Sequence, residues 1–263
     1  MVTKKDLLWL NLRELPYFRA LLRAVEARFY AGLDFPQPTL DLGCGDGHFA
    51  SVAFDRHLEV GLDPGAAPLR EAARRGVHRA LVQADGGRMP FPDGYFASAF
   101  SNSVLEHIPT VEEVLAEVGR VLRKGAPLAF SVPNHRFDPN LSLGLAFDRA
   151  GLGYLGQRYR RFFERIARHH HLDPPEVWQA RLERAGFNLE SWWHYFSPAA
   201  LRILEWGHWF GLPALASYRL TGRWILAPTY WNLALTRRLV RPYFEEALHR
   251  EDGVCTFFVA RRC

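Results

Sequence analysis

Long hydrophobic runs are missing from this chain of 263 residues. Its longest uncharged stretches, residues 206–218 and 224–236, have about 13 residues each, whereas a helix that crosses a bilayer needs about 20. The first apolar stretch contains acidic residues and no small-residue cleavage site follows it, which argues against a signal peptide. We therefore expect a cytoplasmic protein without a transmembrane helix.

Cysteine is also scarce. The three cysteines, Cys44, Cys255 and Cys263, form no CxxC pair and have no zinc-type spacing to histidine. The histidine run 169–171 does not indicate a metal site, because adjacent residues rarely share one face and no carboxylate stands at a suitable spacing. Neither a disulfide framework nor a metal is expected, which fits a reducing compartment.

Lysine is the third scarce residue, since arginine supplies nearly all of the 33 basic side chains. The net charge is +5, and the positive surplus lies in residues 134–250. This distribution is compatible with an anionic substrate, a phospholipid surface or a solvated arginine-rich surface. The apolar fraction of 48% and the charged fraction of 23% are typical of globular proteins, so disorder is not expected.

Strand and helix patterns alternate along the chain. Apolar spacing over residues 5–34, interrupted by Pro16, predicts two helices. A buried strand begins after Pro38, and the strands that follow are expected at 58–63, 80–85, 95–101, 127–133, 187–196 and 254–262, with helices at 47–56, 66–75, 110–123 and 174–186. This alternation indicates an α/β fold with a mostly parallel sheet.

The clearest motif is DLGCGDG, residues 41–47, directly after the first expected strand. Glycine allows positive φ and close approach of a ligand to the backbone, and the following helix offers free N–H groups at its start. A dinucleotide-binding fingerprint needs its third glycine at position 48, where this chain has His48. An NAD-dependent oxidoreductase is therefore the less favoured interpretation.

Two acidic residues follow later strands. Asp63 ends the strand LEVGLD, where a carboxylate can accept hydrogen bonds from ribose hydroxyls. The alternative role for Asp63 is to cap the helix that begins nearby. Asp85 stands at the end of the next expected strand, so three strand ends converge on one site.

These residues resemble the class I S-adenosylmethionine-dependent methyltransferases, whose motif I is D/E-x-G-x-G-x-G. Residues 86–108, GGRMPFPDGYFASAFSNSVLEHI, resemble the type 11 methyltransferase family. The resemblance covers about residues 38–133 and continues weakly through 185–187 and the last strand. It implies S-adenosyl-L-methionine as cofactor and a Rossmann-like, doubly wound sheet of seven mostly parallel strands with an antiparallel last strand.

The resemblance also implies a set of cofactor-binding residues, in which Asp85 takes the adenine amino group. They are Asp41, Gly43, Cys44, Gly45, Gly47, Asp63, Pro64, Asp85, Gly86, Ser101 and Asn102. We expect a single methyltransferase domain over 1–263, with N-terminal helices (1–34), a cofactor-binding core (38–133), a helical, aromatic-rich cap formed by insertions (134–173 and 198–250) and a C-terminal part of the sheet (174–197 and 253–263).

A base can assist methyl transfer by removing a proton from the acceptor, and histidine is suited to this task near neutral pH. His107 and His135 follow the fourth and fifth strands, whose carboxyl ends form the ligand crevice of such sheets. Both are candidate catalytic residues, and a purely structural role remains open for each. Glu106 is a candidate for orienting His107 or touching the acceptor.

The acceptor is expected to be a small or lipid-like molecule, because seven of the eight tryptophans lie between Trp178 and Trp231. This aromatic region is compatible with a lid over an apolar acceptor, a peripheral membrane contact, a homodimer interface or a packed helical subdomain. Nucleic-acid substrates are not expected, because residues 101–103 lack the D/N-P-P-Y/F motif of DNA amino-methylating enzymes. A non-catalytic S-adenosylmethionine-binding module that associates with a membrane or a partner is the main alternative.

Overall fold

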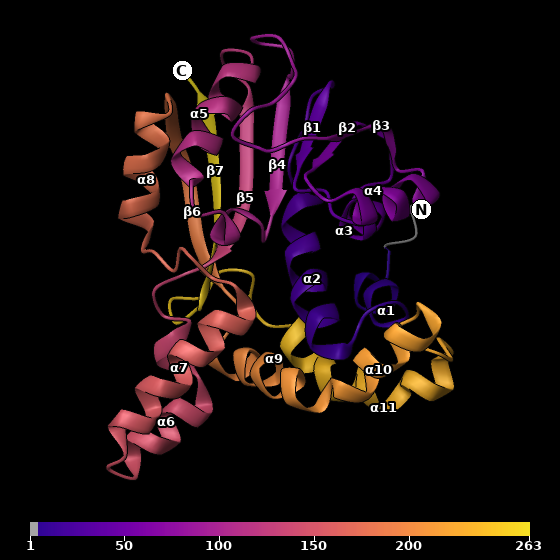
Figure 1. Ribbon diagram of the computed structural model, residues 1–263, viewed down its shortest axis with the longest axis vertical. Coiled ribbons are helices and arrows are strands. Elements are labelled where there is room, and N and C mark those ends of the chain that lie inside the picture. Colours follow the sequence, from indigo (N-terminus) through magenta and orange to yellow (C-terminus); the bar gives the residue numbers. More distant parts are fainter. Residues whose placement is uncertain (1–4) are drawn as a thin grey trace.

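The computed structural model describes residues 5–263 (Figure 1). Two helices open the chain, α1 (Leu7–Leu12) and α2 (Tyr17–Tyr30), and Pro16 caps the second. Proline suits this position because it has no N–H to pair at the start of a helix and cannot continue the preceding one. The two predicted helices are confirmed.

One sheet organises the molecule, with strand order β3-β2-β1-β4-β5-β7-β6. The strands are β1 (Thr39–Leu42), β2 (Leu58–Asp63), β3 (His78–Gln83), β4 (Ser98–Asn102), β5 (Pro127–Pro133), β6 (Phe187–Tyr195) and β7 (Cys255–Arg262). Strands β1 to β5 pair in parallel, and β7 is antiparallel to both β5 and β6. The predicted fold class, including the antiparallel last strand, is confirmed.

Both faces of the sheet are covered, because successive strand residues point to opposite sides. Phe257 of β7 packs in a core with α2 and α3 (His48–Ala53), whereas its neighbour Phe258 packs in a second core. That second core contains residues of α5 (Val111–Val121) and α8 (Pro175–Arg184). The remaining crossover helix, α4 (Ala66–Arg75), packs beside β3 and α3.

Element boundaries differ from the predicted ones at two points near the site. The strand expected at 80–85 is β3, which ends at Gln83, so Asp85 lies in the loop beyond the strand. The helix expected at 47–56 ends at Ala53, because Phe54 is already extended. Propensity and pattern define the ends of an element poorly, since the neighbouring strands decide where pairing stops.

The two predicted insertions are helical. The first contains a short 3-10 helix, η2 (Asp138–Asn140), and two α-helices, α6 (Ser142–Arg149) and α7 (Gly153–Ala167). The second contains α9 (Pro198–Phe210), α10 (Leu212–Thr221) and α11 (Tyr230–Phe244). Both lie beyond the carboxyl ends of the parallel strands (Figure 1), and no helix within residues 5–263 has the length and apolar character needed to cross a bilayer.

Helix α2 connects the sheet to the second insertion. It packs against α9 and α11 as well as against the sheet. Gly207 of α9 lies directly against Phe18 of α2, so closely that a Cβ atom on Gly207 would overlap the Phe18 side chain. The absence of a side chain at position 207 therefore sets the distance between α2 and α9.

We expect Gly207→Ala to destabilise the protein. The overlap with Phe18 costs about 1–3 kcal/mol, more than the roughly 1 kcal/mol that alanine gains over glycine inside a helix. Thermal unfolding should therefore show a Tm lower by a few degrees. Gly32→Ala, in an exposed turn where a Cβ meets only the Phe29 carbonyl at 3.7 Å, is the matched control and should leave Tm unchanged. A Gly207→Ala protein as stable as the wild type would contradict this packing.

Candidate functional site

The glycine-rich turn is held against the neighbouring strand. The backbone N–H groups of Gly43 and Cys44 donate hydrogen bonds to the Leu62 carbonyl at 2.8 and 3.0 Å. Gly43 has φ +74°, and a Cβ atom there would overlap Val104, which follows β4. Gly45, with φ +55°, has no neighbouring atom within 4 Å of the position a Cβ would take. The turn therefore packs tightly at Gly43 and presents open backbone at Gly45.

A cavity of about 430 Å³ lies over this turn. We call it the glycine-turn cavity. Its walls include Asp41, Gly43, Cys44, Gly45 and Asn102, all of which were predicted to bind the cofactor. The structure thus brings together predicted residues from the ends of β1 and β4, which are adjacent in the sheet.

The carboxylate of Asp63 is anchored by two backbone N–H groups. Gly45 donates to Oδ2 at 3.0 Å and Gly65 donates to Oδ1 at 2.8 Å. The second contact is a turn onto Gly65, which is itself the N-cap of α4, so Asp63 does not cap that helix, whereas the first contact ties Asp63 to the glycine-rich turn. Because each oxygen keeps a lone pair, the half-buried carboxylate can still accept a further hydrogen bond.

Asp41 lies beneath the turn and is almost completely buried. Its Oδ2 atom is 2.8 Å from Nε2 of the buried His78 on β3. Burial raises the pKa of Asp41, although the contact with His78 opposes this effect. Asp41 therefore forms the floor of the cavity and links three strands, since β2 lies between its own strand and β3.

The other predicted cofactor residues lie outside the walls of this cavity. Gly47 precedes α3, and Pro64 and Asp85 are exposed, with Asp85 accepting a hydrogen bond from the Gly87 N–H at 2.7 Å. Gly86 is buried close to Val114, and the Ser101 hydroxyl donates to the Leu42 carbonyl at 3.0 Å. Their roles, and that of Asp63, remain predictions.

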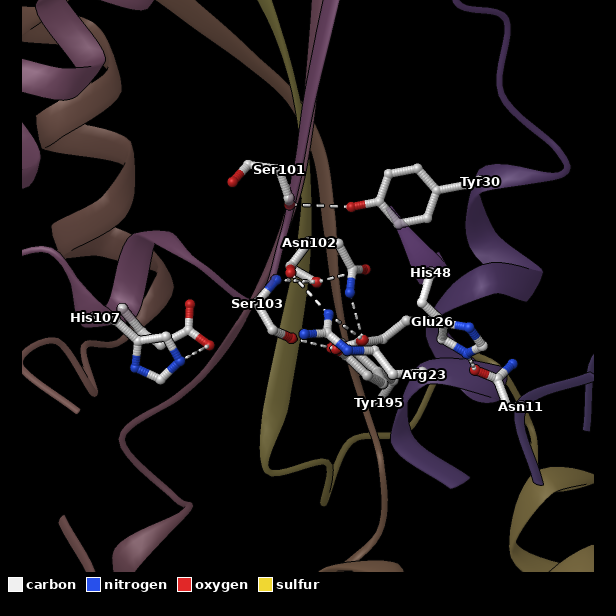
Figure 2. Close-up of polar contacts among 12 residues, drawn as sticks. Asn11, Arg23, Glu26, Tyr30, His48, Ser101, Asn102, Ser103, His107 and Tyr195 are labelled. Atoms are coloured by element: carbon white, nitrogen blue, oxygen red, sulfur yellow. Dashed lines mark hydrogen bonds and ion pairs between the residues drawn. The ribbon is translucent and has the colours of Figure 1, made fainter. Parts of the chain in front are cut away.

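Helix α2 supplies site residues that the sequence analysis missed. Arg19 and Arg23 line the glycine-turn cavity, and Arg23 donates to the Asn102 carbonyl at 2.8 Å. Glu26 is completely buried and accepts hydrogen bonds from Asn102 and Ser103 (Figure 2). One feature of the sequence could have indicated Glu26: it stands four residues after Leu22 and three before Phe29, on the apolar side of the helix.

His48, at the position where a dinucleotide-binding fingerprint has glycine, is buried. Its Nε2 atom is 3.2 Å from Oδ1 of Asn11, and its Nδ1 atom is 3.4 Å from Oε2 of Glu14. The contacts with His48 and Arg75 lower the pKa of Glu14 to about 2, although burial opposes them. His48 thus fastens the glycine-rich turn to the N-terminal helices.

A second cavity of about 360 Å³ adjoins the first and shares Arg19, Arg23 and Trp224 with it. We call it the apolar cavity. Most of its wall is hydrophobic and comes from α2 and from both insertions: Phe18, Leu22, Phe137, Phe163, Leu204 and Leu215. Glu106, His107 and His169 form a polar part of the same wall.

The structure separates the two candidate catalytic histidines. His107 lines the apolar cavity, and burial lowers its pKa. His135 is exposed, is part of neither cavity wall, and lies beside the ring of His194. The geometry therefore favours His107, which in Figure 2 lies on the opposite side of Asn102 from His48.

The histidine run 169–171 belongs to the same neighbourhood. The N–H groups of His170 and His171 donate to the Glu106 carbonyl at 2.8 and 3.2 Å, and the His169 ring stacks on His107. Within the described part of the chain, no group of three or more His, Cys, Asp or Glu side chains is arranged to hold a metal ion.

Comparison with known proteins shows that part of this chain is similar to methyltransferases. The family model described as "Methyltransferase domain" matches residues 40–130. The chain is similar to malonyl-[acyl-carrier protein] O-methyltransferase of Legionella pneumophila, with 33% identity over 36% of each chain. It is also similar to trans-aconitate 2-methyltransferase of Methylobacterium nodulans, with 34% identity over 40% of this chain and 42% of the relative. These alignments span about two fifths of each relative.

Solved structures match over more of the chain. An S-adenosylmethionine-dependent methyltransferase of Thermotoga maritima, described as a possible histamine N-methyltransferase, has a TM-score of 0.58 at 15% identity and covers 94% of this chain and 91% of its own. The [4+2]-cyclase SpnF has a TM-score of 0.56 at 18% identity, over 91% and 80% of the two chains. At these identities the likeness shows the fold alone. The family model therefore identifies a methyltransferase domain over residues 40–130, and the solved structures extend the similarity of fold over most of the chain.

Proposed function

We propose that this protein transfers a methyl group from S-adenosyl-L-methionine to an acceptor held in the apolar cavity. The observation that supports this most directly is that the glycine-turn cavity and the apolar cavity adjoin and share Arg19, Arg23 and Trp224. A group-transfer enzyme needs two ligand sites in contact, because the reacting atoms must approach to about 3–3.5 Å.

The residues of the glycine-turn cavity fit the cofactor. Gly45 leaves open the space that any other side chain would fill, so a ligand can approach the backbone there. Asp63 lies outside the cavity wall but is fixed to it by the Gly45 N–H, and it retains acceptor capacity for the ribose hydroxyls. Arg19 lines this cavity with its guanidinium over the Trp224 ring, and it can face the cofactor carboxylate.

The cofactor supplies an electrophilic methyl group on a sulfonium. The chain's own contribution is then to hold the acceptor in line, to exclude water and to receive a proton where the acceptor loses one. The apolar wall of the second cavity, built by α2 and both insertions, serves the first two tasks. Of the two histidine candidates for receiving the proton, His107 lines the apolar cavity and His135 does not.

The acceptor we propose is a small or lipid-like molecule with an apolar body. The hydrophobic wall of the apolar cavity supports this proposal. Two relatives are named for other acceptors, malonyl-[acyl-carrier protein] and trans-aconitate, so their names do not identify the acceptor of this chain. The [4+2]-cyclase among the structural neighbours has the same fold, so the fold alone does not assign methyl transfer. Retained cofactor binding without turnover would favour the non-catalytic alternative.

We expect Asp63→Asn to weaken binding of S-adenosylhomocysteine by about 10- to 100-fold, since hydrogen bonds to a charged acceptor contribute about 1.5–3 kcal/mol. Isothermal titration calorimetry of the purified protein measures this effect. The control is Asp34→Asn, an exposed carboxylate at the opposite end of the strands, beside a separate cavity. The proposal would be wrong if the folded wild-type protein bound neither S-adenosylmethionine nor S-adenosylhomocysteine.

We also propose a peripheral contact with an anionic lipid surface. Exposed apolar side chains gather around α10 and α11, and we call them the α10–α11 patch: Leu220, Leu226, Trp231, Leu235 and Leu239. Trp231, Leu235 and Leu239 recur at helical spacing on one face of α11. Residues 206–244 contain five arginines and no acidic residue. Two of these arginines, Arg237 and Arg241, form ion pairs with Asp6 and Glu245, and the other three give the patch a positive charge that complements an anionic surface.

We expect cosedimentation with vesicles that contain about one third phosphatidylglycerol and none with pure phosphatidylcholine, with binding reduced by salt. The double variant Trp231→Ser with Leu235→Ser should reduce vesicle binding at least about tenfold. Tyr154→Ser, an exposed aromatic of α7, is the matched control. The lipid proposal is wrong if the wild type does not bind vesicles and instead forms a dimer that the double variant abolishes. The α10–α11 patch would then be the interface with a second copy of the chain.

A further inference from the structure

Two buried atoms in the wall of the apolar cavity have no hydrogen-bond partner. They are Oε2 of Glu106, whose residue is only 2% exposed, and Nδ1 of His169. Buried polar atoms in folded proteins are nearly always paired, so an unpaired one that borders a cavity indicates a ligand that pairs it. An occupant of this cavity is therefore expected to carry a hydrogen-bonding group as well as an apolar body.

Glu106 lies close to the boundary between the two cavities. Asn102, which lines the glycine-turn cavity, precedes it by four residues, and Ser103, which lines the apolar cavity, lies between them. A single turn of chain after β4 thus passes from the wall of one cavity into the wall of the other. A group that pairs with Glu106 lies on the side of the apolar cavity that faces the end of β4.

The neighbouring His107 has a defined tautomer. Its Nδ1 atom is 3.0 Å from the Arg168 carbonyl, which can only accept, so Nδ1 carries the proton. Nε2 therefore has a free lone pair, 3.7 Å from Oε1 of Glu106. The His107 side chain is 39% exposed and connects the buried Glu106 with solvent.

Resting on the proposed methyl transfer, we propose that the acceptor is a hydroxyl compound and that Glu106 is the catalytic residue that takes its proton. In this step the bond between methyl carbon and sulfur breaks and its electron pair stays on sulfur as a thioether. A bond forms between methyl carbon and the hydroxyl oxygen. The hydroxyl proton moves to Oε2 of the Glu106 carboxylate. The carboxylic acid formed in this way then releases a proton to solvent through Nε2 of His107, which restores the carboxylate.

The charges around Glu106 suit this task. Burial raises the pKa of Glu106 to about 8; the nearby Glu26 of α2 adds to the rise, whereas its own backbone and Arg23 oppose it. His107 and His169 also face it, and Cys255 of β7 lies close enough for its own pKa to be raised by Glu106. A base works best when its pKa lies near the working pH. The carboxylate form increases as pH rises through about 8, so the rate should rise over the same range.

A hydroxyl fits this wall better than the other common acceptor groups. Arg19 and Arg23 disfavour a protonated amine in the shared part of the two cavities. A carboxylate acceptor has no proton to give to Oε2 and would be repelled by ionised Glu106. A hydroxyl is neutral and can donate to Oε2 while it accepts from a second group.

The test uses three probes that share one ring system: 2-naphthol, 2-naphthoic acid and 2-methylnaphthalene. Calorimetry with the S-adenosylhomocysteine complex should show that the wild type binds 2-naphthol at least about tenfold more tightly than the other two. Glu106→Leu should abolish this preference and leave 2-methylnaphthalene binding intact. Equal affinity for 2-naphthol and 2-methylnaphthalene in the wild type, or tighter binding of the acid, would overturn the assignment.

A second measurement tests proton transfer. Radiolabelled methyl transfer to 2-naphthol should slow by about 100-fold or more in Glu106→Gln, with the rise near pH 8 lost and 2-naphthol affinity changed less than about threefold. Glu176→Gln, an exposed carboxylate of α8, should behave like the wild type. A wild type that binds but does not methylate 2-naphthol, or a Glu106→Gln protein with wild-type rate and pH profile, would exclude the role.

Failure of this inference is distinguishable from failure of the proposed function. All Glu106 variants should bind S-adenosylhomocysteine as the wild type does, because Glu106 is not in the wall of the glycine-turn cavity. A wild-type protein that does not bind the cofactor would contradict the proposed function itself. Normal cofactor binding without hydroxyl preference would remove only the assignment of Glu106.

Discussion

The architecture of the site depends on one buried carboxylate. Glu26 of α2 is inaccessible to solvent, and it accepts hydrogen bonds from Asn102, Ser103 and Tyr195 at 2.6–2.8 Å. A buried charge without partners would cost several kcal/mol, so the contacts that satisfy Glu26 must form together. They join α2 to the ends of β4 and β6, and thereby place α2 as a common wall of both cavities (Figure 2).

Much of the sheet could be predicted because its determinants are local. Apolar runs bounded by glycine and proline located the strands, and Pro16 located the break between α1 and α2. The motif DLGCGDG predicts a ligand site at the end of β1, where the glycine-turn cavity lies, since the spacing of its glycines reflects the backbone of the turn itself. The end of β3 was predicted less well, because pairing with β2 rather than the local pattern decides where that strand stops.

The second wall of the site could not be predicted, because it depends on contacts between residues far apart in the sequence. Arg23 and Asn102 are 79 residues apart, and Tyr195 and Glu26 are 169 apart. Nothing in the local pattern of α2 indicates which residues its polar groups will meet. The apolar cavity has the same origin, since Phe18, Phe163 and Leu204 come from three segments that only the completed fold brings together. His107 and His135 looked equivalent in the sequence, and only the packing of the first insertion distinguishes them.

That insertion also controls the protonation chemistry of the turn after β4. Helix α7 ends at Ala167, and its C-cap Arg168 adopts a left-handed conformation and accepts at its carbonyl a hydrogen bond from Nδ1 of His107. The next residues fix the Glu106 backbone through its carbonyl. The tautomer of His107 and the burial of Glu106 are thus set by the end of a helix more than 60 residues away, outside the residues that match the methyltransferase domain. Proteins that share that domain but differ in this insertion would keep the glycine-rich turn while presenting different chemistry to the acceptor, because the insertion and not the shared motif determines which atoms of Glu106 and His107 remain free to react.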